Sequence, residues 1–382
     1  MSAPSVIFAG GGTGGHIFPA LAIAEALRRQ RETADARTVM IGSDRPLDAV
    51  LLGGAVERGE LDAFAIIRAR PFGVRPRAAW GLLKTWGACV RETRLLIRDE
   101  RERGGASPVL VAMGGFVSAA PVRAAITERC PVLLVNLDSV PGKANRWIAH
   151  RADERLTVGA SGDLFEPMEA RAIHPIVRPE IRACPEPESA RLALGLDPVA
   201  RTLLVTGGSQ GARTVNAFLT RFADAHAALL NEHGWQVLHQ SGAEDAEAVD
   251  AIYRGAGVRA RVLPFIDDIA SAWGAATVSV CRAGAGTVAE AWATRTPSLF
   301  LPYPFHKDAH QRANAAWLTD RGAGVLGDDR IDTEANLVHN GPLLAGLLRD
   351  ETRRASLRDM LQELGPADGA DQAARAISGL VG

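Results

Sequence analysis

Several features that mark known protein classes are missing from this chain, and each absence narrows its function. No run of about 18 apolar residues occurs, so we expect no helix that spans a bilayer. The first basic residue is Arg28, which leaves no positively charged segment before the first apolar run, and we expect no export signal. A formal net charge of −1 gives no overall attraction to nucleic acid or anionic lipid. Any such attraction has to come from a local patch.

Cysteine is scarce, and no metal-ligand motif is present. The chain has no CxxC pair, so we expect buried, reduced thiols in a cytosolic protein. The four cysteines lie far apart and are Cys89, Cys130, Cys184 and Cys281. The acidic pairs Asp267-Asp268 and Asp328-Asp329 have no third ligand at motif spacing, so we interpret them as helix caps or solvated turns. We expect neither a metal nor another cofactor.

Short apolar runs rich in β-branched residues alternate with longer segments of helical pattern. This alternation is typical of parallel βαβ units, and 382 residues exceed what one hydrophobic core usually serves. We therefore predict an α/β fold with two Rossmann-like domains whose parallel sheets face across a cleft. Expected strands lie near 5–9, 38–42, 64–67, 109–112, 131–135 and 154–158, and near 202–206, 235–239, 260–263, 277–280, 297–301 and 323–326; expected helices include 19–30, 78–98 and 118–128.

The boundary between the two domains is predicted at residue 178. Residues 178–200 contain four prolines, each of which removes a backbone donor and restricts the preceding residue, so this segment is predicted to link the domains. We expect an N-terminal domain over 1–177 and a C-terminal domain over 178–361. A last helix over about 362–382 is expected to pack back onto the N-terminal domain.

Three glycine-rich loops each follow an apolar, strand-like run. They are Gly10–His16, Met113–Ser118 and Thr206–Gly211. A strand that turns through glycines into a helix presents unpaired backbone N–H groups and the positive end of a helix dipole, which favour a diphosphate. A purely structural turn is the alternative for each loop. The binding candidates in these loops are Thr13, Gly14, Gly15, Gly115, Ser209 and Gln210.

His16 closes the first loop, near the expected start of a helix. The helix dipole there disfavours the imidazolium form, so a neutral ring could accept a proton. The alternative is a hydrogen-bonded turn residue. We take His16 as a candidate general base.

Two segments of the second half place polar groups at expected helix starts. After Cys281, the residues Gly286 and Thr287 could admit a phosphate, and Glu290 one turn later could accept both hydroxyls of a ribose. The alternative for Glu290 is a solvated helix residue. His310, Gln311 and Asn314 fall within one turn and could bond sugar hydroxyls, or they could cap an exposed helix.

Residues 66–98 form a basic segment, with eight arginines or lysines and the single acid Glu92. Trp80 and Trp86 accompany these basic residues, a composition that suits the surface of an anionic membrane. Each basic residue near anionic lipid contributes about 1 kcal/mol, enough in sum for reversible docking. A solvated basic helix is the alternative.

Read together and in order, these motifs resemble the MurG family of inverting UDP-N-acetylglucosamine transferases. The matching segments are Gly11–Ala22, Met113–Ser118, Gly207–Ala212, His239–Gly242, Phe265–Asp268 and His306–Asp308. The resemblance covers about residues 5 to 326. It implies a glycosyltransferase-B fold, and transfer of N-acetylglucosamine from UDP-N-acetylglucosamine to the muramyl 4-hydroxyl of lipid I, a polyprenyl-diphosphate-linked acceptor of peptidoglycan synthesis. It also implies a peripheral protein on the cytoplasmic face of the membrane, without nucleic acid as a partner.

The resemblance assigns roles to individual residues. The donor is held mainly by the C-terminal domain, with uracil on the backbone of Ile266 and the ribose on Glu290. The diphosphate is surrounded by Arg178, Ser209, Gly286 and Thr287, and the sugar is bonded by Gln311 and Asn314. His16 then assists the acceptor hydroxyl in losing its proton.

This sequence departs from the family pattern at three places. Val135–Asp138 stands where the family has His-Glu-Gln-Asn, in a segment that continues to Asn145 and borders the reaction centre. Phe116 replaces a tyrosine, and His310 replaces the first of two glutamines. Asp138 is therefore an alternative general base, since a carboxylate in a closing cleft can have a raised pKa.

Three other functions stay open at this point. The same chemistry could act on another lipid acceptor. A nicotinamide-dependent oxidoreductase could use the first loop, although the third loop and the segment up to Glu290 would then have no task. A binder of nucleotide sugars without turnover is the third possibility.

Overall fold

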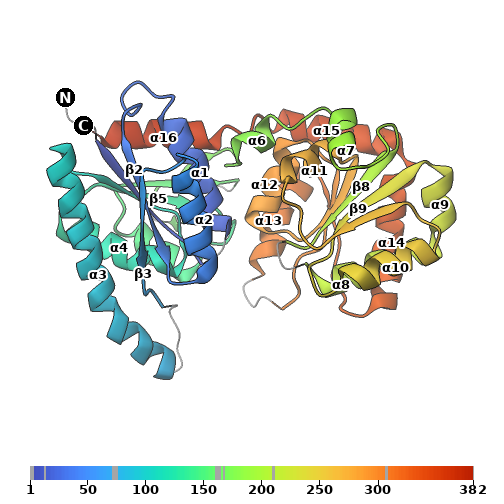
Figure 1. Cartoon of the computed structure of the whole chain (residues 1–382), viewed down its shortest axis with the longest axis horizontal. Helices are drawn as coiled ribbons and strands as arrows, with labels where there is room; N and C mark the ends of the chain where they lie inside the picture. The colour runs from blue at the N-terminus through green and yellow to red at the C-terminus, as the bar shows by residue number, and fades with distance from the viewer. Residues whose placement is uncertain are drawn as a thin grey trace. The chain divides into compact units, whose positions relative to one another are not determined.

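A computed structural model of the chain describes residues 4–12, 14–70, 76–159, 165–166, 168–208, 211–305 and 309–381, with backbone alone over 76–84. The chain divides into two compact units, one formed by Met1–Arg178 and Asp368–Gly382 and the other by Pro179–Ala367. Figure 1 shows that each unit is a sheet with helices on both of its faces. Thr13, Ser209 and Gln210 lie outside the described residues.

The first unit is built on a seven-stranded parallel sheet in the order β3-β2-β1-β4-β5-β6-β7 (Figure 1). Its strands are β1 Ser5–Ala9, β2 Arg37–Ser43, β3 Ala63–Ile67, β4 Val109–Ala112, β5 Val132–Asn136, β6 Glu154–Val158 and β7 Arg171–Ile173. Its helices are α1 Gly14–Leu27, α2 Pro46–Glu57, α3 Pro76–Gly104, α4 Gly115–Thr127, α5 Lys143–Ala149 and α16 Gly369–Leu380.

The second unit repeats this arrangement with six parallel strands in the order β10-β9-β8-β11-β12-β13. Its strands are β8 Arg201–Thr206, β9 Trp235–Gln240, β10 Ala260–Leu263, β11 Val278–Cys281, β12 Ser298–Phe300 and β13 Val325–Leu326. Its helices are α6 Pro179–Arg182, α7 Pro187–Ala193, α8 Arg213–Ala225, α9 Ala227–Glu232, α10 Ala246–Gly255, α11 Ile269–Ala275, α12 Ala285–Ala293, α13 His310–Thr319, α14 Thr333–Arg349 and α15 Glu351–Glu363.

Both sheets have the doubly wound strand order, so each has a point where the order reverses. These points lie between β1 and β4 in the first unit and between β8 and β11 in the second. In such sheets, ligands bind beyond the carboxyl ends of the strands at the reversal point. All three predicted glycine-rich loops, and the segment after Cys281, follow one of these four strands.

Alternate residues of the strands supply the cores on the two faces of each sheet. Val6 and Phe8 of β1 pack on the face covered by α1 and α16, whereas Ile7 and Ala9 pack on the opposite face, against α4. Because the sheet is covered on both faces, its strands are continuous apolar runs. The final helix α16 is held on α1 partly by Arg29, whose Nη2 lies 2.9 Å from Asp371 Oδ1.

The predicted fold class of two parallel Rossmann-like sheets is confirmed, but some element boundaries differ. Helices α1 and α4 begin at Gly14 and Gly115, earlier than the expected 19 and 118, and so include Pro19 and Pro121. The glycines predicted to bind phosphate are therefore the first residues of helices. Strand β7 has only three residues and gave no periodic signal.

The two units divide between Arg178 and Pro179, and the proline-containing segment that follows forms two short helices. Pro179 is the first residue of α6, and Pro187 lies at the start of α7. A proline is well placed there, because its missing N–H group would have no helical partner anyway. Helix α7 packs against α11, so these residues belong to the second unit.

The cysteines are free thiols, and Cys89, Cys130 and Cys281 are buried while Cys184 is half-buried. Burial raises the pKa of the Cys281 thiol to about 12. Within the described ranges, no helix is long and apolar enough to cross a membrane, and no three acidic, histidine or cysteine side chains cluster as metal ligands.

His239 is a fully buried polar residue in the core of the second unit. Its Nε2 lies 3.0 Å from Asn216 Oδ1, and its Nδ1 lies 3.0 Å from the Tyr253 hydroxyl. Asn216 Nδ2 donates to the carbonyl of Ser241 and to Asp245, which leaves Asn216 Oδ1 as the acceptor for an Nε2–H group. Burial lowers the pKa of His239 to about 3, so the ring is neutral.

We predict that His239 makes the protein less stable in acid. The unfolded chain takes up a proton near pH 6.5 that the folded chain binds only near pH 3. As the pH decreases from 6.5 to about 3, this residue alone should lower the free energy of unfolding by about 1.4 kcal/mol for each pH unit. Urea unfolding of wild type and His239→Gln across this range measures the difference in slope, with His150→Gln on the surface as the control. Identical slopes for wild type and His239→Gln would contradict the assignment.

Candidate active site

The first and second glycine-rich loops meet at His16. The imidazole packs on Gly115, where an added Cβ atom would lie 3.2 Å from His16 Cε1. Gly115 has a φ of +75°, a conformation that side chains other than glycine rarely adopt. The glycine is therefore needed both for the turn into α4 and for the position of the ring.

Two buried asparagines join the second loop to the segment after β5. Asn145 Nδ2 donates to Asn136 Oδ1 at 2.8 Å, and Asn136 Nδ2 donates to the carbonyl of Asp138 at 2.7 Å. The Asn145 amide also lies against Gly114, which has a φ of +96°. Asn145 thus fixes the local backbone, and its predicted contact with substrate stays a prediction.

His16 is a neutral imidazole close to two carboxylates. Burial lowers its pKa, while the negative charges of Asp138 and Asp48 and the backbone of Gly11 act in the opposite direction. The Nδ1 atom is buried and has no hydrogen-bond partner among the residues that the structure describes. The structure therefore brings together both candidate bases, His16 and Asp138, in the first unit.

Asp48 organises the first loop and was missed by the sequence analysis. The side chain is fully buried in the first turn of α2, and its Oδ2 accepts hydrogen bonds from Gly12 N at 2.7 Å and from Ser43 N at 2.8 Å. Arg45 Nη1 donates to the Gly12 carbonyl at 2.5 Å. The signal in the sequence that could have identified Asp48 is its position as an acidic residue shortly after the second strand.

In the second unit, Gln240 connects the third loop to the predicted uracil segment. Its Nε2 donates to the Gly208 carbonyl at 2.7 Å, and its Oε1 accepts from Ile266 N at 3.1 Å. The N–H group of Ile266 is thus engaged by a side chain of the same unit, and the predicted contact of the Ile266 backbone with uracil stays a prediction. Gly211 has a φ of +72° and lies directly against the Ser241 carbonyl.

Helix α12 begins without a side-chain cap. Its N-cap is Gly284, and no acidic residue lies in its first turn, which contains Gly286 and Thr287. One turn on, the half-buried Glu290 accepts a hydrogen bond through Oε2 from Trp273 Nε1 at 2.9 Å. Glu290 is therefore oriented by a buried indole, unlike a solvated helix glutamate.

The residues at the start of α13 that are predicted to bond the donor sugar also form hydrogen bonds to the backbone of neighbouring loops. Gln311 Oε1 accepts from Tyr303 N at 2.8 Å, and Asn314 Nδ2 donates to the Ala283 carbonyl at 3.3 Å. His310 is the first residue of α13, after Ala309 at a φ of +47°. Their contact with a sugar stays a prediction.

Arg178 and the described part of the basic segment make contacts within the first unit. The Arg178 guanidinium lies 4.6 Å from the centre of the Phe18 ring. Arg94 and Arg98 both pair with Glu128, at 2.7 and 3.0 Å. Trp86 packs edge-on against Trp147 and is half-buried, and its predicted place at a membrane surface stays a prediction. Phe72 and Arg75, and the side chains of residues 76–84 with Trp80, lie outside the described part of the chain.

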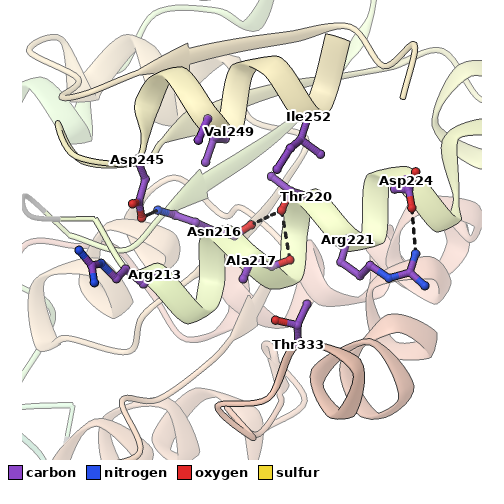
Figure 2. Close-up of a pocket in the computed structure, with 11 residues that line it drawn as sticks. Arg213, Asn216, Ala217, Thr220, Arg221, Asp224, Asp245, Val249, Ile252 and Thr333 are labelled. Atoms are coloured by element: carbon purple, nitrogen blue, oxygen red, sulfur yellow. Dashed lines mark hydrogen bonds and ion pairs between the residues drawn. The ribbon is translucent and has the colours of Figure 1, made fainter. Parts of the chain in front are cut away.

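A groove of about 580 Å³ lies between α8 and α10, away from the predicted donor residues (Figure 2). Val249 and Ile252 form its apolar wall, and Asn216 and Thr220 lie opposite. Asn216 bonds Asp245, and Thr220 bonds the carbonyl of its own helix. The groove therefore shows no unpaired polar group that identifies a ligand.

Comparisons with known proteins agree with this geometry. The profile of the Glycosyltransferase family 28 N-terminal domain matches residues 6–157, and that of the Glycosyltransferase family 28 C-terminal domain matches residues 202–357. A protein of Burkholderia multivorans (strain ATCC 17616 / 249) is 35% identical over 379 residues, which cover 97% of this chain and 95% of that protein. One of Desulforudis audaxviator (strain MP104C) is 34% identical, covering 99% and 98%. Both are named UDP-N-acetylglucosamine--N-acetylmuramyl-(pentapeptide) pyrophosphoryl-undecaprenol N-acetylglucosamine transferase.

Solved structures share the fold at low sequence identity. MurG of Acinetobacter baumannii has a TM-score of 0.71 at 22% identity, covering 99% of this chain and 100% of that one. The calicheamicin glycosyltransferase CalG4 has a TM-score of 0.65 at 16% identity, covering 100% and 99%. The predicted resemblance and the predicted fold class are both confirmed.

We predict that His16 titrates below its ordinary value of 6.5, because burial disfavours the charged ring. Replacing Asp138 by asparagine should lower the pKa of His16 further, because it removes a negative charge that favours the protonated ring. NMR titration of the labelled imidazole measures both, with Asp44→Asn, whose carboxylate pairs with Arg70, as the control. A His16 pKa above 6.5, or no response to Asp138→Asn, would contradict this electrostatic description.

Proposed function

Because the chain belongs to glycosyltransferase family 28, we propose that it transfers N-acetylglucosamine from UDP-N-acetylglucosamine to a lipid-linked N-acetylmuramyl-pentapeptide. It is a hexosyltransferase, and the product is the disaccharide precursor of peptidoglycan. The relatives that cover almost the whole chain carry this activity in their names. We assign donor binding to the second unit and acceptor activation to the first.

The observation that carries the proposal is the uncapped start of α12, beside the loop after β8, at the reversal point of the second sheet. Backbone N–H groups and the helix dipole at this point favour a diphosphate. Glu290, oriented by Trp273, lies one turn away and accepts the ribose hydroxyls in our assignment. These two features together match a uridine diphosphate better than they match an isolated phosphate.

The chemistry that we assign is a single in-line displacement. The muramyl 4-hydroxyl attacks the anomeric carbon, the bond from that carbon to the diphosphate oxygen breaks, and the configuration inverts. The hydroxyl proton passes to His16 Nε2, since Nδ1 is buried. Backbone donors at the helix starts stabilise the negative charge that develops on the departing UDP.

The acceptor side includes the membrane. Since the proposed acceptor is lipid-borne, we place the protein on the cytoplasmic face of the membrane, with the segment 66–98 toward the lipid. Leu95 of α3 is 54% exposed, although Arg94 and Arg98 are paired with Glu128. Another lipid acceptor is the second candidate, because the segment Val135–Asp138 departs from the family and Asn136 within it is fully buried.

We predict that Gly286→Ala abolishes donor binding without harming the fold. Gly286 is exposed, and a Cβ atom there meets nothing within 4 Å, so only a bound ligand would clash with it. Alanine is favoured over glycine in a helix by up to about 1 kcal/mol, so the melting temperature should stay or rise. Calorimetry should show UDP affinity reduced by at least about tenfold. Gly379→Ala in α16, which is equally unobstructed, is the control; equal UDP affinity in both variants would refute the site.

We also predict that His16→Ala loses turnover but keeps the donor. Loss of a general base should lower kcat by about a hundredfold to ten-thousandfold, while UDP affinity stays unchanged because all the assigned donor residues except Arg178 lie in the other unit. Transfer of radiolabel from UDP-N-acetylglucosamine to a short-chain lipid acceptor measures this. Product that persists in His16→Ala but vanishes in Asp138→Ala would move the base to Asp138.

A further inference from the structure

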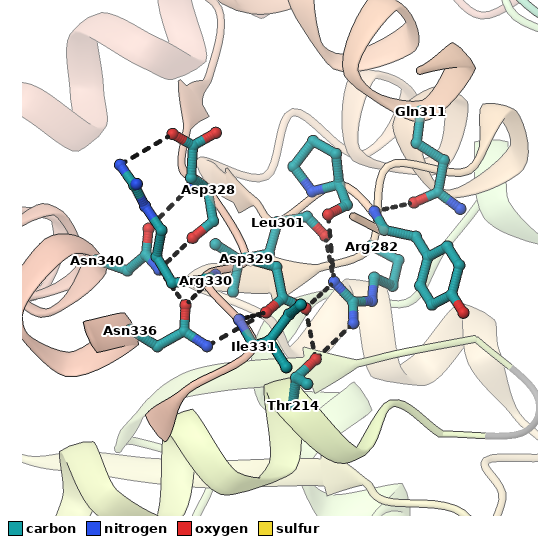
Figure 3. A network of polar contacts seen from close by, with 12 residues as sticks. Thr214, Arg282, Leu301, Gln311, Asp328, Asp329, Arg330, Ile331, Asn336 and Asn340 are labelled. Carbon is teal, nitrogen blue, oxygen red and sulfur yellow. Dashed lines mark hydrogen bonds and ion pairs between the residues drawn. The ribbon is translucent and has the colours of Figure 1, made fainter. Parts of the chain in front are cut away.

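A buried ion pair lies behind the proposed donor site and has no part in the function described so far. Arg282 follows β11 and Asp329 follows β13, and their side chains are 9% and 1% exposed. Arg282 Nη1 lies 2.8 Å from Asp329 Oδ2 (Figure 3). The prediction that Asp328-Asp329 is a helix cap or a solvated turn is wrong for Asp329, whose side chain is buried. The Asp328 side chain is 38% exposed and pairs with Arg312.

The Arg282 side chain connects three loops at the carboxyl edge of the second sheet. Its Nη1 donates to the Leu301 carbonyl at 2.9 Å, at the end of β12, and its Nη2 donates to Thr214 Oγ1 at 2.7 Å, in the first turn of α8. Its own backbone lies two residues before Gly284, the N-cap of α12. Arg282 therefore joins the two helix starts that we assign to the diphosphate.

Asp329 is held in place from its other side. Its Oδ1 accepts from Ile331 N at 2.8 Å and from Asn336 Nδ2 at 3.3 Å, while its Oδ2 also accepts from the Thr214 hydroxyl (Figure 3). Burial opposes its charge, but hydrogen bonds from Thr214 and Ile331 and the charge of Arg282 hold the pKa of Asp329 below its usual range. The pair is therefore ionised at neutral pH.

We propose that Asp329 is a positioning residue for the donor diphosphate, acting through Arg282 and Thr214 on the starts of α8 and α12. This inference rests on the proposed function. A diphosphate has to meet backbone donors from both helix starts at once, so their spacing decides how well it binds. Removing one partner of a buried pair leaves the other charge uncompensated, which weakens the hold on Arg282 and, through Arg282, on the two helix starts.

The test is Asp329→Asn, which keeps the size of the side chain and removes its charge. We expect UDP affinity to fall by about tenfold, with uridine affinity unchanged because uridine has no phosphate. The KM for UDP-N-acetylglucosamine should rise in parallel, while the KM for the lipid acceptor should not change. Asp328→Asn, the neighbouring exposed carboxylate, is the matched control and should leave all four values unchanged.

A purely structural role gives a different result. If Asp329→Asn lowers the melting temperature but binds UDP as wild type does well below that temperature, the proposal is overturned. Equal losses of UDP and uridine affinity would overturn it as well. UDP binding by wild type is measured before any variant. If wild type binds no UDP, the proposed function itself has failed, and this outcome is distinct from failure of the Asp329 proposal.

A second variant covers the case in which Asp329→Asn does not fold. Arg282→Met with Asp329→Leu replaces the buried pair by apolar side chains of similar size, which is often neutral for stability. This double variant loses the bond to Thr214, so we expect it to fold and to show the same loss of UDP affinity. UDP affinity equal to that of wild type in the double variant would overturn the proposal.

Discussion

The proposed function depends on one interaction, between a diphosphate and backbone N–H groups at helix starts that no side chain caps. Helices α4, α8 and α12 begin after Gly114, Ala212 and Gly284, none of which caps its helix with a side chain. Helices α11, α14 and α15 each begin after an aspartate that accepts a backbone N–H bond, whereas α2, α5, α7, α9, α10 and α13 also begin without a side-chain cap. What sets α4, α8 and α12 apart is that they also follow strands at the reversal points of the sheets, where backbone donors and the helix dipole favour an anion.

Parallel strand order decides where these helix starts lie. In both units the order reverses next to the first strand, so the loops that follow the two central strands separate and leave room at the edge. Side chains then set the finer geometry from the flanks. Asp48 and Asn145 do this in the first unit, and Gln240 and Arg282 do it in the second. Such supporting contacts matter because, where catalysis depends on how the reacting groups are positioned, a small displacement of these groups lowers the rate steeply.

The sequence predicted the parts of this structure that depend on local pattern. Continuous apolar runs located most strands to within one or two residues. A strand that is buried on both faces is apolar throughout, so its ends can be recognised in the sequence. Glycines after strands located the candidate loops. The expected starts of α1 and α4 are too late, because both helices begin at glycines that local propensity assigns to a loop.

What could not be predicted depends on contacts between distant residues. Nothing near Asp329 in the sequence shows that Arg282 lies against it, and nothing near Asp48 shows that its carboxylate closes on Gly12. The hydrogen bond from the Ile266 N–H group to Gln240, 26 residues away in the sequence, is another such contact. The edge-on packing of Trp86 on Trp147, which belongs to another helix, is equally invisible in the sequence.

The most direct test of the account is amide hydrogen exchange of the whole protein with and without UDP. The account predicts that UDP slows exchange in the peptides that contain 207–212 and 284–287, at the starts of α8 and α12. Protection confined to the peptide containing 10–16, or no protection in either segment of the second unit at saturating UDP, would contradict it.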